Sequence, residues 1–323
     1  MRPWNWAVAF LLAGTLQAQI QEQRLVGGYV LDSRGGTLRS VRGIPGATRL
    51  GDPVPFPQVI AQATVRNGRA VVVSAEEPPR VSLLRQLDAP IPDLIPIESS
   101  IGPVSRVYLN AQATTALLYS AVTESFQFVT GLGGTPELSA PTPASDLKGK
   151  FLAAAVAESR GCALLTSYDD EDGYLQHVCA GSGQSGLIAR LPGVRPAAVA
   201  WFQQDQDALI ADAAASELLV LPRFLSGAAP VALAGATAGL DDPAALLPLD
   251  STAIAVMNRG SASLVIVDSR QSGEGRRVEL PEMPTRLELL DGFGALACTG
   301  IGPDPLLLVD PRRDYAAFYV PMN

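Results

Sequence analysis

A short apolar pattern that recurs six times constrains the fold of this chain more than any other feature. Its copies are Ala70-Val-Val-Val, Ala116-Leu-Leu-Tyr, Ala163-Leu-Leu-Thr, Ala208-Leu-Ile-Ala, Ala253-Ile-Ala-Val and Ala295-Leu-Ala-Cys. Successive alanines are 46, 47, 45, 45 and 42 residues apart. Repeats of this length built only from strands predict an all-β fold, a β-propeller with one four-stranded blade in each repeat. We expect the alanine-led strands to lie near the propeller axis, where crowding favours small side chains.

The stretch 250–281 shows the repeating unit most clearly. It contains three short strands, at residues 253–257, 263–268 and 276–280, and turn residues separate them. Further strands precede the alanine-led strands at 104–110, 197–202, 245–249 and 286–290. A third strand follows them at 124–130, 176–180, 217–222, 264–268 and 306–310. A weaker, more polar fourth strand suits an outer edge exposed to water. Because no blade can bury both of its faces alone, stacking around a closed ring must provide the core.

The number of blades depends on an amino-terminal hairpin. Residues 29–43, YVLDSRGGTLRSVRG, resemble residues 266–279, IVDSRQSGEGRRVE, and should therefore be the third and fourth strands of a unit. This hairpin either completes a seventh blade with carboxy-terminal strands such as 315–320, or adds an edge to a six-bladed ring. The last repeat already has four strands, which favours six. The length favours seven, because 305 residues divided by 45 give about 6.8 units. We expect seven.

The first residues predict export. Met1-Arg2-Pro3 is followed by an apolar run at 4–16 and by Ala18 before a polar segment. This arrangement is typical of a secretory signal peptide at residues 1–18, and the alternative, an uncleaved anchor, would need a longer apolar run. The remaining 323 − 18 = 305 residues, 19–323, suit a single propeller domain that is secreted or periplasmic.

Composition excludes several function classes. The net charge of −8 argues against nucleic acids and anionic membrane surfaces as partners. The longest other uncharged stretch, 224–240, contains Pro230 and three glycines, so no second segment is expected to span a membrane. With 17% charged residues, 30 glycines and 26 prolines, the chain is rich in strands and turns.

Three cysteines are too few for a disulfide-stapled scaffold. Cys162 and Cys179 flank the acidic turn at 169–173, and pairing that hairpin about its centre places Cys162 opposite residue 180, one position away. A disulfide between them would suit an exported protein, and both the bonded and the free state stay open. Cys298 is left over and is predicted to be a buried thiol.

The repeats resemble a known class of proteins. Units of about 45 residues with strands such as 264–270, LVIVDSR, and 306–312, LLLVDPR, are similar to the secreted bacterial β-propellers of the YVTN and NHL-like repeat class. That resemblance implies a ring scaffold used for binding a ligand or a protein, and only some members of the class are enzymes. No unit carries the literal Tyr-Val-Thr-Asn signature, so the resemblance supports the fold and not an activity.

Two motifs could carry chemistry but have simpler interpretations. The run 181–186, GSGQSG, matches a dinucleotide-binding fingerprint, but the residues after it lead to Pro192 and cannot form the helix that holds a pyrophosphate. We interpret it as a turn between strands. The carboxylates at 169–172 do not have the spacing of a calcium loop, so a solvated turn is expected there.

The remaining candidates are single residues. His177 is the only histidine, so a typical zinc site cannot form, and no Gly-x-Ser-x-Gly motif supplies a nucleophile. Trp201 and Phe202 end one inner strand, where core packing is favoured over a binding surface. The mature chain has one tryptophan, too few for the docking motifs of a quinone-dependent propeller enzyme.

The sequence therefore predicts a non-catalytic binding protein, a monomer that holds a ligand or a protein partner at one mouth of the central channel. It identifies no catalytic residue, metal ligand or cofactor. The alternative is a carbohydrate-active hydrolase or lyase that uses paired channel-facing carboxylates, one with a raised pKa. A third possibility is a structural protein whose ring face docks a larger partner.

Overall fold

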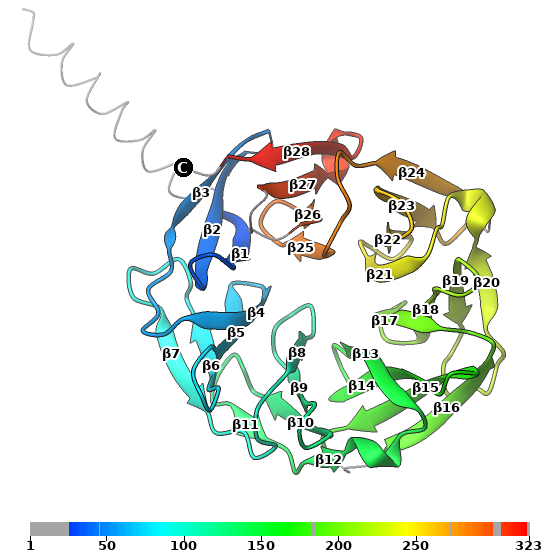
Figure 1. Ribbon diagram of the computed structural model, residues 1–323, viewed down its shortest axis with the longest axis horizontal. Helices are drawn as coiled ribbons and strands as arrows, with labels where there is room; N and C mark the ends of the chain where they lie inside the picture. The colour runs from blue at the N-terminus through cyan, green and yellow to red at the C-terminus, as the bar shows by residue number, and fades with distance from the viewer. Residues whose placement is uncertain (1–25, 45, 182–184, 272, 300–304, 322–323) are drawn as a thin grey trace, which may run out of the picture.

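A computed structural model describes residues 26–321 except 45, 182–184, 272 and 300–304. The signal peptide predicted at 1–18 lies outside the described residues. The described chain forms seven antiparallel sheets arranged as a ring around a central channel (Figure 1). It contains 28 strands and three short 3-10 helices, η1 (Ala144–Asp146), η2 (Ala236–Ala238) and η3 (Pro311–Arg313). The protein is a seven-bladed β-propeller, which confirms the predicted fold class and blade number.

Each blade is one continuous piece of the chain. The first contains β1 (Val26–Asp32), β2 (Thr37–Ile44) and β3 (Ala47–Pro53). The second contains β4 (Ile60–Arg66), β5 (Arg69–Ser74), β6 (Val81–Arg85) and β7 (Asp93–Ile97). The third contains β8 (Arg106–Leu109), β9 (Ala116–Ser120), β10 (Ser125–Thr130), β11 (Glu137–Leu138) and β12 (Thr142–Pro143), and both β11 and β12 pair with β10.

The other four blades have four strands each. The fourth contains β13 (Lys150–Val156), β14 (Cys162–Tyr168), β15 (Asp172–Cys179) and β16 (Ser185–Pro192). The fifth contains β17 (Pro196–Phe202), β18 (Asp207–Asp212), β19 (Glu217–Leu221) and β20 (Val231–Ala234). The sixth contains β21 (Pro243–Pro248), β22 (Ala253–Asn258), β23 (Ser263–Asp268) and β24 (Gly275–Glu279). The seventh contains β25 (Glu288–Leu290), β26 (Ala295–Ala297), β27 (Leu306–Asp310) and β28 (Ala316–Val320).

The alanine-led strands are not the axial strands, so that prediction was wrong. They are β5, β9, β14, β18, β22 and β26, the second strand of each blade, and the strand before each one lies nearest the axis (Figure 1). A second strand has a partner on both edges and a neighbouring blade on both faces, so most of its residues are buried. Residues 254–258 of β22 are all buried, whereas β21, which borders the channel, is mostly half-buried. Small side chains therefore mark the most enclosed strand rather than the most central one.

The amino-terminal hairpin also differs from its predicted role. Residues 29–43 form β1 and β2, which join β3 in a blade of their own instead of combining with the carboxy-terminal strand. That last strand, β28, pairs with β27 at the outer edge of the seventh blade. The reason is β3, whose Leu50 is buried opposite Val41 and adds the strand that the hairpin lacked. The sequence of β3 is mostly polar, so a search for apolar runs does not detect this strand.

The core consists of clusters between successive blades rather than one central mass. Between the sixth and seventh blades, for example, Ala255 and Leu264 pack against Leu296, Leu307 and the sulfur-bearing Cys298. Burial raises the pKa of the Cys298 thiol to about 12, so this cysteine is an inert core residue, as predicted. In the part of the chain that the structure describes, no helix is long and apolar enough to cross a membrane.

Candidate binding site at the channel mouth

The central channel widens into a cavity of about 590 Å³. Its walls are the innermost strands β4, β8, β13, β17 and β21, which contribute aliphatic residues such as Val107, Leu109, Val199 and Leu246 (Figure 1). Innermost strands use only one edge for pairing, so their other edge faces the channel. Leu109 and Leu246 are half-buried there, whereas Val107 and Val199 are buried. An apolar cavity of this size can enclose the apolar part of a small ligand.

One end of the cavity carries three carboxylates. Glu158, Asp205 and Asp250 stand in the loops that follow β13, β17 and β21, and all three line the cavity. We call this end the acidic mouth. Because innermost strands of a propeller run in the same direction, the loops after them meet at one end of the channel. Glu158 and Asp205 are 47 residues apart, one repeat length, and this spacing was the signal that sequence reasoning missed.

Glu158 holds the neighbouring loop of the third blade. Its carboxylate accepts hydrogen bonds from the backbone N–H groups of Ala111 and Gln112 and from the side-chain amide of Asn110. Burial raises the pKa of Glu158, the two backbone hydrogen bonds lower it, and the charge of Asp205 raises it further. Both carboxylate oxygens of Glu158 therefore accept hydrogen bonds that join the third and fourth blades.

Asp205 makes the same kind of contact one blade further on. It is 4% exposed, and its Oδ2 accepts from the backbone N–H of Glu158 at 2.9 Å and of Ser159 at 3.0 Å. The hydroxyl of Ser159 donates to the same oxygen at 3.0 Å. Each of the two carboxylates thus holds the mouth loop of the preceding blade by hydrogen bonds. We call these two successive contacts the carboxylate chain.

The loop that carries Asp205 has an unusual backbone. Gln203, Gln204 and Asp205 have φ angles of 51°, 57° and 62°, so three consecutive residues other than glycine adopt the left-handed conformation. Each such residue costs roughly 1–2 kcal/mol. The buried carboxylate of Asp205 and a 2.8 Å hydrogen bond from Gln203 Nε2 to the carbonyl oxygen of Ser251 hold the turn in place. The turn leaves the exposed side chain of Gln204 at the rim of the cavity.

Asp250 also serves its own loop. Its Oδ1 accepts from the backbone N–H of Thr252 at 2.6 Å and of Ala253 at 2.7 Å, and these bonds lower the pKa of Asp250. All three mouth carboxylates therefore satisfy backbone donors. The mouth combines a negatively charged rim with an apolar interior, and its carboxylates accept hydrogen bonds from the backbone of the protein.

Trp201 packs in the core. It is 9% exposed, its Nε1 donates to the carbonyl oxygen of Ala155 at 2.9 Å, and its ring meets Phe224 edge to face at a centroid distance of 4.8 Å. Phe202 is also buried, in the cluster between the fifth and sixth blades. The tryptophan hydrogen bond ties β17 to β13, so the two innermost strands beside the acidic mouth keep a fixed spacing.

A disulfide joins Cys162 and Cys179, which lie directly opposite each other in β14 and β15 with Cα atoms 4.0 Å apart. The sequence had placed Cys162 opposite residue 180. The difference of one position arises because Tyr168 pairs with Gly173 and leaves residues 169–172 as the loop. Cys162 follows the loop of Glu158, and its carbonyl oxygen accepts from the N–H of Ala157 at 2.8 Å. The disulfide therefore braces the fourth blade beside the acidic mouth.

The acidic turn at 169–173 lies at the opposite end of the fourth blade from the disulfide. Asp169 accepts from the N–H of Asp172 at 2.9 Å, and a hydrogen bond from the Tyr174 hydroxyl lowers its pKa further than any other contact. Asp172 is 6% exposed and pairs with Arg190. No three metal-ligating side chains gather anywhere in the described ranges. The turn uses its carboxylates locally, and the structure does not bring them to the channel.

The other two sequence candidates lie in the same blade. His177 is half-buried in β15, and its ring covers Gly186, where an added Cβ would lie 2.6 Å from His177 Cε1. Of the run 181–186, residues 182–184 lie outside the described residues, Gly181 is in a turn, and Gly186 belongs to strand β16 rather than to a helix. Neither candidate faces the channel cavity.

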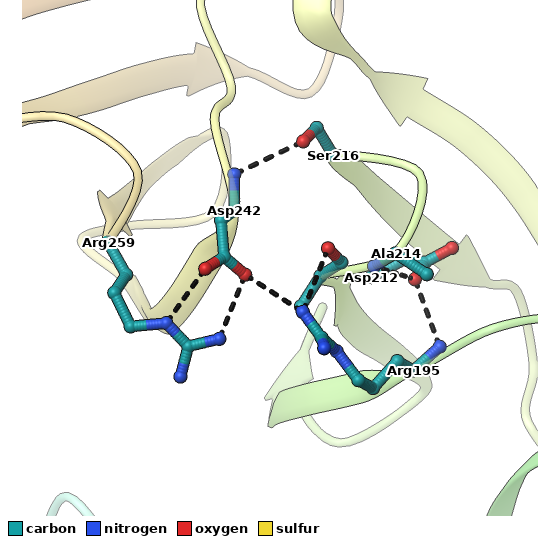
Figure 2. A network of polar contacts seen from close by, with 7 residues as sticks. Arg195, Asp212, Ala214, Ser216, Asp242 and Arg259 are labelled. Atoms are coloured by element: carbon teal, nitrogen blue, oxygen red, sulfur yellow. Dashed lines mark hydrogen bonds and ion pairs between the residues drawn. The ribbon is translucent and has the colours of Figure 1, made fainter. Parts of the chain in front are cut away.

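A second polar cluster, missed from the sequence, joins the fifth and sixth blades (Figure 2). Asp242 lies between Arg259, whose Nε is 2.8 Å away, and Arg195, whose guanidinium is 3.2 Å away. Asp212 accepts from the N–H groups of Arg195 and Ala214 beside it (Figure 2). The hydrogen bond from Arg259 is the main cause of the lowered pKa of Asp242. The cluster is a clamp between blades, since its central carboxylate is already shared by two cations.

The fold defines the class of protein: a seven-bladed β-propeller with a cavity on its axis. No family model and no curated protein matches the sequence. A functionally unknown protein from Desulfotomaculum acetoxidans is similar, with a TM-score of 0.65, 11% identity and coverage of 91% of this chain and 94% of that one. A protein from Lactobacillus plantarum gives a TM-score of 0.61 with 13% identity, 91% of this chain and 94% of the other.

An enzyme is also among the similar structures. Virginiamycin B lyase from Staphylococcus aureus has a TM-score of 0.54 and 8% identity over 87% of this chain and 86% of its own. At such identities the likeness shows the fold alone, because one propeller architecture carries many activities.

Proposed function

We propose that this propeller is an exported, non-catalytic binding protein whose ligand lies at the acidic mouth. The observation that carries the proposal is the combination of a cavity of about 590 Å³ with aliphatic walls and a rim whose carboxylates already serve backbone donors. A catalytic acid or base needs free access to a reacting proton. Glu158 and Asp205 instead accept several hydrogen bonds from the protein, so the mouth favours binding over turnover.

The geometry favours a small ligand with an apolar body and a polar head. The body would enter the aliphatic cavity, and the head would meet the exposed amide of Gln204, which can both donate and accept hydrogen bonds. The negative rim favours a neutral or cationic head over an anionic one. The same rim and scaffold would serve for a loop of a protein partner with these features.

A pair of matched variants tests the site. Gln204 and Gln112 are both exposed glutamines on mouth loops, of the fifth and the third blade, but only Gln204 lines the cavity. Native mass spectrometry of the purified protein should detect a retained small molecule, and thermal-shift screening of oligosaccharides and short peptides supplies a second route to a ligand. Gln204→Ala should weaken binding about tenfold, whereas Gln112→Ala should not, because about 1.4 kcal/mol of lost contact is a factor of ten. Equal affinities for the two variants would contradict the site.

A carbohydrate-active hydrolase or lyase is the second candidate. One specific observation favours it: Glu158, with a raised pKa, and Asp205 both line the channel. This function requires turnover of a glycan that Glu158→Gln abolishes, with the variant still folded. A panel of soluble polysaccharides followed by reducing-end and unsaturated-product assays would decide, and the absence of any product would leave the binding function.

The proposed location follows from the predicted signal peptide at residues 1–18 and from the disulfide, which suits an oxidising compartment. We expect a monomeric mature chain of residues 19–323 that forms one domain. The intact mass of the exported protein should correspond to an amino terminus at Gln19 and be two hydrogen atoms below the mass of the reduced chain. A full-length mass, or a mass with all thiols reduced, would contradict export.

A further inference from the structure

The first blade lacks an innermost strand among its described residues. Strand β1 begins beside the hairpin of the seventh blade, where Gly27 O accepts from the N–H of Gly292 at 2.9 Å and of Phe293 at 3.2 Å. That hairpin connects an innermost strand to a second strand, so β1 starts at the end of the propeller where second strands start. It also ends on the nearly buried Asp32, just as β18 ends on Asp212. Thus β1 corresponds to the second strand of other blades.

Among the residues that the structure describes, the inner edge of β1 therefore has no paired strand. In an antiparallel pair, the N–H and C=O groups of one residue point toward one neighbouring strand, and those of the next residue point the other way. The carbonyl oxygen of Leu38 in β2 accepts from the N–H of Val54 at 2.7 Å, so Leu38 is directed toward β3. Its partner across the pair, Leu31, therefore directs its N–H and C=O away from β2, and so does Tyr29. Within the described ranges, no backbone group bonds to either residue on that side.

A slot lies along this edge. It has a volume of about 310 Å³ and is bordered by β1, the end of β4 and the residues of β25. Arg66 spans it with a hydrogen bond of 3.3 Å to the carbonyl oxygen of Leu289. Unpaired strand edges of this kind bind peptides by adding a strand to the sheet.

The charges around the slot are mainly negative. Asp88, Glu288 and Asp291 line it, and Arg66 is the one cation in the lining. Asp88 and Asp291 are exposed at its rim. An occupant with basic side chains would therefore be attracted, and an acidic one repelled.

We propose that this edge of β1 is a docking site for an extended, basic peptide segment of a partner protein, which completes the first blade as its innermost strand. Backbone hydrogen bonds to Tyr29 and Leu31 would hold the segment, and the three carboxylates would select its charge. Arg66 lines both the slot and the channel cavity, but the other residues of the two linings differ, so the proposal does not depend on the channel ligand.

The test uses the full chain and two fluorescein-labelled octapeptides, one of alternating lysine and valine and one of alternating glutamate and valine. Fluorescence anisotropy should show at least tenfold tighter binding of the basic peptide. Amide hydrogen exchange followed by NMR should show fast exchange at Tyr29 and Leu31 in the free protein and at least tenfold slower exchange with the basic peptide. The amides of Val30 and Asp32, which face β2, should be protected in both states.

A matched pair of variants isolates the backbone contact. Leu31→Pro and Leu31→Ala both remove the leucine side chain, but only the proline removes the N–H that points away from β2. The alanine variant should bind the basic peptide within about threefold of the wild type, and the proline variant should lose at least tenfold. The exchange measurement on the wild type stands even if the proline variant does not fold.

Several results would overturn the proposal. Equal affinity for the two peptides would contradict selection of the occupant by charge. Equal affinities of the two Leu31 variants for the basic peptide would contradict strand pairing at this edge. Protection of Tyr29 and Leu31 in the free protein would mean that the chain itself fills the slot, and competition by a peptide of residues 19–25 would identify the segment. A dimer in native mass spectrometry with these amides protected would assign the edge to a second copy.

Discussion

The guanidinium of Arg66 in β4 donates a hydrogen bond to the carbonyl oxygen of Leu289 in β25, although these strands belong to the second and the seventh blade. The first blade stands between those blades in the ring (Figure 1). The N–H of Asn67 likewise bonds to the carboxylate of Asp291. Among its described residues, the first blade presents its second strand, and not an innermost one, to the channel, and the contacts reach past that strand. Direct bonds between the second and the seventh blade therefore contribute to ring closure.

The left-handed turn at the acidic mouth should store strain that glycine relieves. Gln204, with a φ of 57°, is exposed, so replacing it removes no core contact. We expect Gln204→Gly to raise the free energy of unfolding by about 1 kcal/mol, because glycine adopts positive φ without steric cost. Chemical denaturation measures this change. Gln112→Gly, on the mouth loop of the third blade, is the control and should lower stability, since it only adds freedom to the unfolded chain. A loss at both positions would contradict the strain.

The carboxylate chain of Glu158 and Asp205 should contribute measurably to the free energy of unfolding. Asp205→Ala leaves the N–H groups of Glu158 and Ser159 without their acceptor in a nearly buried place. We expect a loss of about 1–3 kcal/mol in the free energy of unfolding. Glu171→Ala, on the exposed acidic turn, should change it by less than about 0.5 kcal/mol. Equal stability of the two variants would show that the carboxylate chain does not hold the loops.

The clamp between the fifth and sixth blades should make stability depend on pH. The pKa of Asp242 is lowered in the folded protein, chiefly by Arg259, so the unfolded chain binds a proton at higher pH than the folded one. The stability from the pair is fully present above the ordinary aspartate pKa of about 3.9 and is lost as the pH falls below it. The difference in the free energy of unfolding between the wild type and Asp242→Asn should therefore become smaller as the pH falls through that window. Urea-unfolding curves at several pH values measure this difference. Parallel curves for the two proteins would exclude the clamp.

Overpacking should distinguish two of the repeated alanines. Ala208 is fully buried in β18, whereas Ala253, at the start of β22, is half-buried. Ala208→Leu should cost about 1–3 kcal/mol, since the second strand has a packed blade on each face. Ala253→Leu should cost less than about 1 kcal/mol, because part of the new side chain can reach solvent. Thermal denaturation of both variants measures the order, and a larger loss for Ala253→Leu would contradict the burial described.

The repeat period was enough to predict the architecture. Strands such as 253–257 and 263–268 were located to within a residue of β22 and β23, because each is an apolar run closed by turn residues. The order of strands within a blade was not predictable in this way. Alanine at the head of a strand reports close packing, and a strand can be closely packed at the axis or between two blades.

The roles of the mouth residues could not be predicted from the sequence either. Glu158 and Asp205 repeat with the blades, but each looked like an ordinary acid among the 32 in the chain. Their hydrogen bonds reach Ala111 and Glu158, which are 47 residues away in each case, so only the stacked blades reveal the role. Asp242 and Arg195 are likewise joined across 47 residues.

By itself, the sequence determined the all-β class, the repeat length and the buried state of Cys298, because these depend on local patterns of burial and turns. The chain length favoured seven blades while the count of strands favoured six, and the tertiary structure decided for seven. The tertiary structure alone decided which strand faces the channel, that β3 completes a separate first blade, and which carboxylates meet at the mouth. Those features depend on contacts between residues about one repeat or more apart. Periodicity records that the blades are alike, but the direction and place of each strand are set by how the blades pack together.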